Sequence, residues 1–250
     1  MPGTDLEPPI TLSEFDGVRY LHFGSEWVQG AMRLARPLEL ELEYVRQMMG
    51  WMLFMHPPVA LAQLGLGAGA LTRFCHHYLT TSNLYVAERS GSVIRASRQW
   101  FRLPPDDLRL RVIQQDAHAF IREAKAGCFG VIQSDLYDQE ARGPVIDSRA
   151  FYRDCHAALA SPGILVVNLF GEHASYARNS DRIRQVFDGR VIELPSTQAG
   201  NVVMLAFKGP ELSVSSRVLL ERARVIARAY GLESIEWART LLGEQQLLVV

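Results

Sequence analysis

The chain has 250 residues, of which 48% are hydrophobic and 21% charged, and its formal net charge at pH 7 is -1. This balance excludes a general electrostatic attraction to nucleic acid or to an anionic membrane surface. The length suits one α/β domain with a small appendage and can bury a sizeable core. Since no apolar run approaches the roughly 20 residues needed to cross a bilayer, we expect no membrane span.

Targeting and cysteine features bear on the cellular compartment. Residues 1–17 show neither the basic segment nor the apolar stretch of a signal peptide. Cys75, Cys128 and Cys155 are an odd number without CxxC spacing, which favours free thiols in a reducing environment. The histidines form no HxH or HExxH pattern, so we expect no metal site. These features indicate a soluble cytoplasmic protein.

The N-terminal part predicts two kinds of element. Residues 10–34 combine β-branched and aromatic residues with the turn signals "DG" and "FGSE", which predicts a β-hairpin or small meander. Residues 38–55 place apolar side chains at helical spacing and predict an amphipathic helix that ends before Pro57. We therefore expect an N-terminal hairpin and helix over residues 1–56 and a larger domain over 57–250.

The larger domain alternates apolar runs with helical patterns. Such alternation predicts an α/β fold whose mostly parallel, seven-stranded sheet carries helices on both faces, with an antiparallel closing edge. The expected strands are 59–66, 83–89, 108–116, 128–138, 163–171, 190–195 and 201–209. The expected helices are 70–79, 91–101, 117–125, 148–160, 180–189 and 215–231.

Carboxylates follow several of these strands. Ligands of open parallel sheets bind at the carboxyl ends of the strands. Glu88 ends the second strand, Asp116 ends the third, and Asp135 and Asp138 lie where the fourth runs into a polar loop. That much negative charge at one edge would repel a pyrophosphate and attract a cation. A sulfonium nucleoside with an amine partner meets this requirement.

The stretch "GLGAGA" at 65–70 sits between the first strand and its helix. Glycine at positions 65, 67 and 69 permits close backbone approach to a ligand, and the following helix presents free N–H groups. Glu88 lies about 20 residues further on, where a carboxylate can accept hydrogen bonds from ribose hydroxyls. The pair predicts a bound nucleoside. Two other interpretations are a plain strand-to-helix turn and the G-x-G-x-x-A dinucleotide fingerprint.

The stretch from Leu64 to Asn168 resembles the polyamine aminopropyltransferases, the spermidine and spermine synthase family. "GLGAGA" stands where the family has GGGDGG, "AERS" where it has VEID, and "QDA" where it has GDA. "FGVIQSDLYDQ" corresponds to the family's fourth strand and catalytic loop, roughly YDVIIxDSSDP, and keeps both aspartates. Upstream, "WVQGAMRL" resembles the segment whose glutamine, here Gln29, helps to hold the nucleoside.

This resemblance implies a class I methyltransferase-like, Rossmann-like sheet behind a small N-terminal β-region. It implies transfer of an aminopropyl group from decarboxylated S-adenosylmethionine to a polyamine or another small amine, with no tightly bound cofactor and no metal. Asp138 would be the general base and Asp135 would hold the donor ammonium. Gly65, Gly67, Gly69, Glu88, Asp116 and Gln29 would bind the nucleoside. We also expect a homodimer.

Departures from the family pattern leave alternatives open. The family's glycine-turn aspartate is Ala68 here, so we expect the donor tail to be bound differently and Ala68→Asp to favour the decarboxylated donor. The family's tyrosine-histidine-glutamate stretch becomes Tyr44, Val45 and Arg46. An Arg46 that faced the pocket would oppose a polyamine. The alternatives are an S-adenosylmethionine-dependent methyltransferase of a small amine and a non-catalytic nucleoside-binding protein, and the acceptor stays undetermined.

Overall fold

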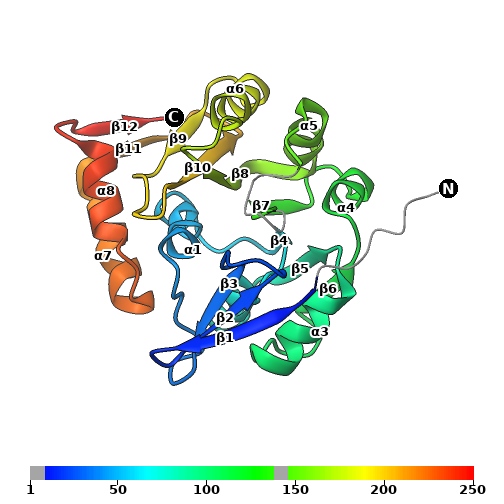
Figure 1. Cartoon of the computed structure of the whole chain (residues 1–250). Helices are drawn as coiled ribbons and strands as arrows, with labels where there is room; N and C mark the ends of the chain where they lie inside the picture. The colour runs from blue at the N-terminus through cyan, green and yellow to red at the C-terminus, as the bar shows by residue number, and fades with distance from the viewer. Residues whose placement is uncertain (1–8, 138–145) are drawn as a thin grey trace.

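A seven-stranded sheet forms the centre of the molecule, with the strand order β6-β5-β4-β7-β8-β10-β9 (Figure 1). The computed structural model describes residues 9–137 and 146–250. The strands are β4 (Ala60–Leu64), β5 (Asn83–Glu88), β6 (Leu110–Gln114), β7 (Phe129–Ser134), β8 (Leu159–Phe170), β9 (Val191–Glu193) and β10 (Asn201–Lys208). The seven strands confirm the predicted α/β sheet, although β7 and β9 are shorter and β8 is longer than expected.

The pairing directions fix where a ligand can bind. β6, β5, β4, β7 and β8 run parallel, whereas β10 is antiparallel to both β8 and β9, as the sequence predicted. From β4 the chain moves outward through β5 to β6 and then returns to β7 on the other side of β4. This reversal is a topological switch point, and a crevice opens there at the carboxyl ends of the strands.

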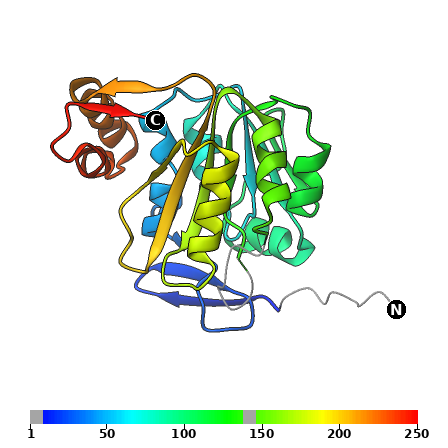
Figure 2. The same cartoon turned by 90° about the horizontal axis from the view of Figure 1, so that it is seen from above.

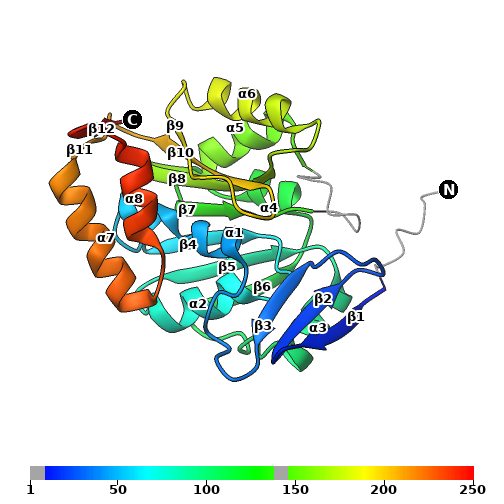
Figure 3. The same ribbon diagram turned by 60° about the vertical axis from the view of Figure 1, so that its left-hand side comes forward.

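Helices cover both faces of the sheet (Figures 2 and 3). On one face, α4 (Ala117–Glu123), α5 (Arg149–Ala158) and α6 (Tyr176–Val186) share a core with β7 and β8. On the other face, α2 (Ala70–Tyr78) and α3 (Gly91–Trp100) pack in a second core. The two cores explain the near-continuous apolar runs of the parallel strands, which are buried on both sides.

A separate three-stranded sheet precedes the main sheet. It consists of β1 (Thr11–Phe15), β2 (Val18–His22) and β3 (Gly30–Arg33) in antiparallel order. Asp16 and Gly17 join β1 to β2 with φ of 48° and 70°, the two left-handed positions of a type I′ hairpin turn. The predicted meander is confirmed, and the "DG" pair accounts for its first turn.

The helix expected over residues 38–55 is wrong in its extent. The structure has a short α1 (Glu43–Gln47) followed by the 3₁₀ helix η1 (Gly50–Leu53). Gly50 is the first residue of η1, and a side chain there would meet Leu194 at 2.7 Å. The apolar side chains of this segment are buried in the same core as α2. The division of the chain at residue 56 stays a prediction.

The C-terminal part contains elements that the sequence did not reveal. The expected helix at 215–231 is α7 (Ser216–Tyr230), which ends at Gly231 with φ of 69°. Beyond it lies α8 (Ser234–Leu242), and β11 (Ser213–Ser215), directly before α7, pairs with β12 (Leu247–Val249) in a two-stranded sheet. Within the described ranges, none of the helices combines the length and the apolarity that a membrane crossing requires.

Candidate active site

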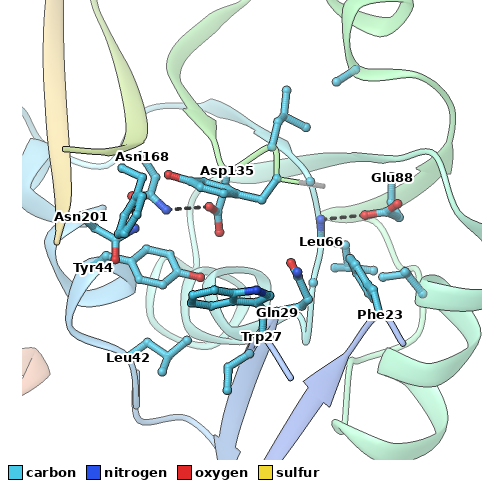
Figure 4. Close-up of a pocket in the computed structure, with 18 of the residues that line it drawn as sticks. Phe23, Trp27, Gln29, Leu42, Tyr44, Leu66, Glu88, Asp135, Asn168 and Asn201 are labelled. Carbon is cyan, nitrogen blue, oxygen red and sulfur yellow. Dashed lines mark hydrogen bonds between the residues drawn. The ribbon is translucent and has the colours of Figure 1, made fainter. Parts of the chain in front are cut away.

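A cavity of about 1110 Å³ opens at the switch point of the sheet (Figure 4). The residues at the ends of β4, β5 and β7 form its base, and the segment between β2 and β3 covers it with Phe23, Trp27 and Gln29. Figure 4 places Tyr44 and Asp135 toward one end of the cavity and Glu88 toward the other. Polar groups from separate segments of the chain thus line the same cavity.

The glycine turn forms part of the wall. Gly65 and Gly67 line the cavity, with φ of 91° and 50°. A side chain at Gly65 would collide with the carbonyl oxygen of Asp135, and one at Gly67 would lie 2.8 Å from that of Gln29. Gly69 is the N-cap of α2, with φ of 68°, and the described lining residues do not include it. The turn thus needs glycine both for its backbone angles and for close packing.

Ala68 points away from the cavity. Its side chain is 2% exposed and packs in a small core with Leu21, Met32 and Phe101. A Cβ on Gly30 of β3 would lie only 2.6 Å from the Cβ of Ala68. The left-handed glycines on either side turn position 68 toward the N-terminal sheet. This orientation argues against the expectation that Ala68→Asp favours the decarboxylated donor, whereas the expectation that the donor tail is bound differently stays a prediction.

Glu88 ends β5 beside the glycine turn. Its Oε2 accepts a hydrogen bond from the Leu66 N–H at 3.0 Å, and its Oε1 accepts one from the Ser90 N–H at 2.8 Å. Burial raises the pKa of Glu88, and these two hydrogen bonds oppose that shift. A carboxylate has about four acceptor positions, and the Arg89 N–H also donates to Glu88, so one position remains for a ligand hydroxyl.

Asp116 and Gln29 also line the cavity, as predicted. Asp116 is exposed and caps α4, with its Oδ1 accepting a hydrogen bond from the Ala119 N–H at 2.9 Å. Gln29 precedes β3, and its N–H donates to the Leu21 carbonyl at 2.8 Å. Figure 4 places Gln29 between Trp27 and Phe23. Both predicted nucleoside-binding residues thus face the same cavity as Glu88.

Asp135 follows β7 directly and belongs to a chain of hydrogen bonds. The Asn168 Nδ2 donates to Asp135 Oδ1 at 2.9 Å, and the Tyr44 hydroxyl donates to the same carboxylate. The Asn201 Nδ2 in turn donates to Asn168 Oδ1 at 3.1 Å. Burial raises the pKa of Asp135 to about 6, although both hydrogen bonds to the carboxylate lower it. A bound cation would favour the ionised form.

Two other sequence predictions concern neighbouring positions. Asp138, the expected base, lies outside the described residues. Arg46 forms an ion pair with Glu233 at 2.7 Å and donates to the Leu40 and Glu41 carbonyls, so its charge is directed away from the cavity. Across the described ranges, no group of three or more His, Cys, Asp or Glu side chains has an arrangement that could hold a metal ion.

Four residues that line the cavity were not predicted from the sequence: Tyr44, Asn168, Asn201 and Trp27. Asn168 and Asn201 are polar interruptions near the ends of the apolar strands β8 and β10, and that signal was visible in the sequence. Tyr44 and Trp27 belong to segments far from the sheet in sequence. Only the packing of α1 and of the β2–β3 connection brings them to the cavity.

Negative charge dominates the described lining residues. Five carboxyl groups contrast with a single guanidinium, that of Arg89; the carboxyl groups are those of Glu26, Glu43, Glu88, Asp116 and Asp135. Coulomb attraction therefore favours a positively charged ligand over an anionic one. The apolar and aromatic side chains between these groups suit a flat ring and an aliphatic chain.

Proteins similar to this chain are known both from their sequences and from solved structures. No protein-family model matches the chain. A polyamine aminopropyltransferase of Neisseria meningitidis is 36% identical over 233 residues, which cover 93% of this chain and 88% of the relative. An identity of this size over nearly the whole of both chains shows common descent.

Solved structures agree on the fold. A probable spermidine synthase from Corynebacterium glutamicum superposes with a TM-score of 0.72 at 22% identity, covering 94% of this chain and 91% of the other. A spermidine synthase in complex with the transition-state analogue AdoDATO gives 0.60 at 21% identity, covering 80% and 74%. Together with the sequence relative, they show that this chain belongs to the polyamine aminopropyltransferase family of transferases.

Proposed function

We propose that this enzyme transfers an aminopropyl group from decarboxylated S-adenosylmethionine to a small amine. The observation that carries the proposal is the buried Asp135 carboxylate in a cavity rich in negative charge. The donor carries a sulfonium and a terminal ammonium, both positive. S-adenosylmethionine itself adds a carboxylate, which this cavity would repel. The name of the Neisseria relative and the analogue bound by the spermidine synthase support the same reaction.

The nucleoside end of the donor is assigned to the glycine turn and Glu88. We propose that the Glu88 carboxylate accepts a hydrogen bond from a ribose hydroxyl and that Gly65 and Gly67 let the backbone approach the ligand. Asp116 would accept a hydrogen bond from the adenine amino group, and Gln29 would cover the nucleoside. The contacts of Glu88 with Leu66 and Ser90 support this assignment because they hold the carboxylate in place.

The propyl end of the donor is assigned to Asp135. A terminal ammonium there would form a charge-assisted hydrogen bond with the carboxylate that Asn168 and Tyr44 orient. Fixing the ammonium and the nucleoside fixes the methylene carbon next to sulfur between them. Such positioning supplies much of the rate enhancement in a bimolecular displacement.

The chemical step is a displacement at that methylene carbon. The nitrogen lone pair of the acceptor amine forms the new C–N bond while the C–S bond breaks, and its electrons stay on sulfur in neutral methylthioadenosine. The acceptor nitrogen must lose a proton before or during attack, and we propose Asp138 as the base that takes it. This assignment rests on the family resemblance of the loop sequence.

Parallel calorimetry with three ligands tests the donor. At pH 7.5 we expect decarboxylated S-adenosylmethionine to bind at least about tenfold more tightly than S-adenosylmethionine, as one repelled charge implies. Asp135→Asn should weaken the decarboxylated donor by about tenfold or more and change methylthioadenosine affinity by less than about twofold. Tighter binding of S-adenosylmethionine than of its decarboxylated form would favour a methyltransferase instead.

Turnover tests the reaction itself. With the decarboxylated donor, small diamines and triamines should each be screened for release of methylthioadenosine and for a product heavier by one aminopropyl group. Release of methylthioadenosine without an amine product would show hydrolysis and contradict the proposal. We further propose a homodimer located in the cytoplasm, and analytical ultracentrifugation tests the first of these two points.

A further inference from the structure

We propose that Asn201 is a positioning residue, which holds the Asn168 amide in the orientation that donates a hydrogen bond to Asp135. The inference rests on the proposed function only in that Asp135 receives the donor ammonium. It extends that function because it assigns a role to a residue that need not touch the reacting atoms. Asn201, Asn168 and Asp135 lie on three separate segments of the sheet region.

The three side chains form a directed chain of hydrogen bonds. Asn201 is the first residue of β10, and Asn168 lies near the end of β8, the strand that pairs with β10. The Asn201 Nδ2 donates to Asn168 Oδ1 at 3.1 Å, and the Asn168 Nδ2 donates to Asp135 Oδ1 at 2.9 Å. Asn168 is 1% exposed and Asn201 9%, so bulk water does not compete freely for these groups.

The direction of these two hydrogen bonds follows from the chemistry of the amide groups. An asparagine side chain has one acceptor end and one donor end. Because Asn201 occupies the acceptor end of Asn168 with an N–H, the donor end of Asn168 must face Asp135. Without the Asn201 donor, Asn168 could rotate and accept a hydrogen bond from a protonated Asp135, which would favour the neutral carboxyl over the carboxylate.

Asn201 is itself held firmly by its backbone. Its N–H donates to Thr197 Oγ1 at 2.9 Å, and its carbonyl accepts a hydrogen bond from the Thr197 N–H, also at 2.9 Å. These two bonds close the loop between β9 and β10 around Thr197, which lines the cavity. The side chain of Asn201 therefore projects from a rigid base, as a positioning residue requires.

Other ionisable groups face Asp135 as well. Tyr44 of α1 donates to it, and Tyr137 lies two residues further along the chain. Burial raises the pKa of both phenols, so both stay neutral between pH 5 and 8. β4 and β8 contribute Gly65 and Asn168, which do not titrate. Among the described groups next to Asp135, none therefore titrates between pH 5 and 8, and a pH-dependent signal of its carboxyl group in that range reports Asp135 itself.

Carbon-13 NMR of the unliganded protein tests the inference without any substrate. The carboxyl carbon of Asp135 is labelled through ¹³C-aspartate and assigned by its loss in Asp135→Asn. We expect a titration midpoint near pH 6 in the parent protein. In Asn201→Leu, which keeps the side-chain size, the midpoint should rise by about half a unit or more because Asn168 is then free to rotate and to stabilise the protonated carboxyl; in Asn201→Asp, whose carboxylate adds a second negative charge near Asp135, it should rise further. Gln198→Ala, an exposed change in the same loop, should leave it in place.

Donor binding provides the second measurement. The pH dependence of the affinity for decarboxylated S-adenosylmethionine should shift upward in the same Asn201 variants, and that for methylthioadenosine, which has no ammonium, should not. Unchanged carbon-13 midpoints in both variants would overturn the role of Asn201. A shifted midpoint in a protein that does not bind the decarboxylated donor would overturn the proposed function and leave the positioning role intact.

Discussion

Glu88 shows how one side chain can serve both the fold and a ligand. Its carboxylate accepts hydrogen bonds from the backbone N–H groups of Leu66, in the glycine turn, and Ser90, the N-cap of α3. The sequence indicated only that Glu88 lies at a suitable distance from the glycines and that its carboxylate can accept hydrogen bonds from ribose hydroxyls. The structure adds that Glu88 joins the two helix entrances on either side of the proposed nucleoside.

Replacing Glu88 by glutamine should therefore have two measurable effects. The amide has only one acceptor atom for two backbone donors, so we expect a fall of a few degrees in the melting temperature. Methylthioadenosine affinity should fall about tenfold or more because a charge-assisted hydrogen bond becomes neutral. Calorimetry and thermal unfolding measure the two effects separately.

Asp116→Asn is the matched control for that change. Asparagine caps a helix about as well as aspartate, so the hydrogen bond to the Ala119 N–H should persist and stability should change little. If Glu88→Gln binds methylthioadenosine as tightly as the parent protein does, the nucleoside does not lie against β5.

At the scale of elements, the glycine turn is held between the main sheet and the N-terminal sheet. Ala68 packs against Gly30 of β3, and the buried guanidinium of Arg73 in α2 donates to the carbonyls of Pro37, Ala68 and Phe101. Burial lowers the pKa of Arg73 to about 10, well above neutral pH, so the side chain keeps its charge. The turn is thus fixed from the side opposite the cavity.

Ala68→Asp should consequently destabilise the protein instead of restoring a donor contact. A carboxylate at a position that is 2% exposed would lie against β3 without a partner, at a cost of about 3 kcal/mol or more. We expect weaker binding of both S-adenosylmethionine and its decarboxylated form, by similar factors. Urea denaturation and calorimetry measure the two effects.

Ala68→Ser adds one small polar atom at the same place and should cost less than the aspartate. A selective gain for the decarboxylated donor in Ala68→Asp, with unchanged stability, would show that the side chain at this position reaches the cavity after all.

At the scale of the whole molecule, the cavity lies between two parts of the chain. Phe23, Trp27 and Gln29 come from the N-terminal sheet region, whereas Glu88 and Asp135 come from the main sheet. A ligand that contacts both parts stabilises their association, since it binds the folded state alone.

Methylthioadenosine at 100 times its dissociation constant should raise the free energy of unfolding by about 2.7 kcal/mol. Amide hydrogen exchange should slow at residues 23–30 and 65–70. Exchange in α7, which lies away from the cavity, provides the internal control. Slowed exchange at 65–70 alone would show that the N-terminal segment does not cover the nucleoside.

The sequence alone predicted the alternating elements, the parallel order with its antiparallel edge and the carboxylates at the strand ends. These features depend on local periodicity and on one general property of parallel sheets, so a linear pattern suffices. The glycine turn and Glu88 were found for the same reason. The sequence did not reveal α8, which has nine residues, or β11 and β12, whose three residues each are too few to show a period.

The tertiary structure decided what local patterns could not. The helix expected over 38–55 is divided into α1 and η1, and Gly50 of η1 packs against Leu194, a neighbour that is remote in sequence. Ala68 faces β3 and not the cavity because backbone angles at the flanking glycines set its direction. Tyr44 and Asn168 hydrogen-bond to Asp135, and Asn201 hydrogen-bonds to Asn168, although these residues lie on distant segments. Periodicity records which side of an element is buried, whereas the partner of a polar side chain depends on packing between segments that sequence distance does not reveal.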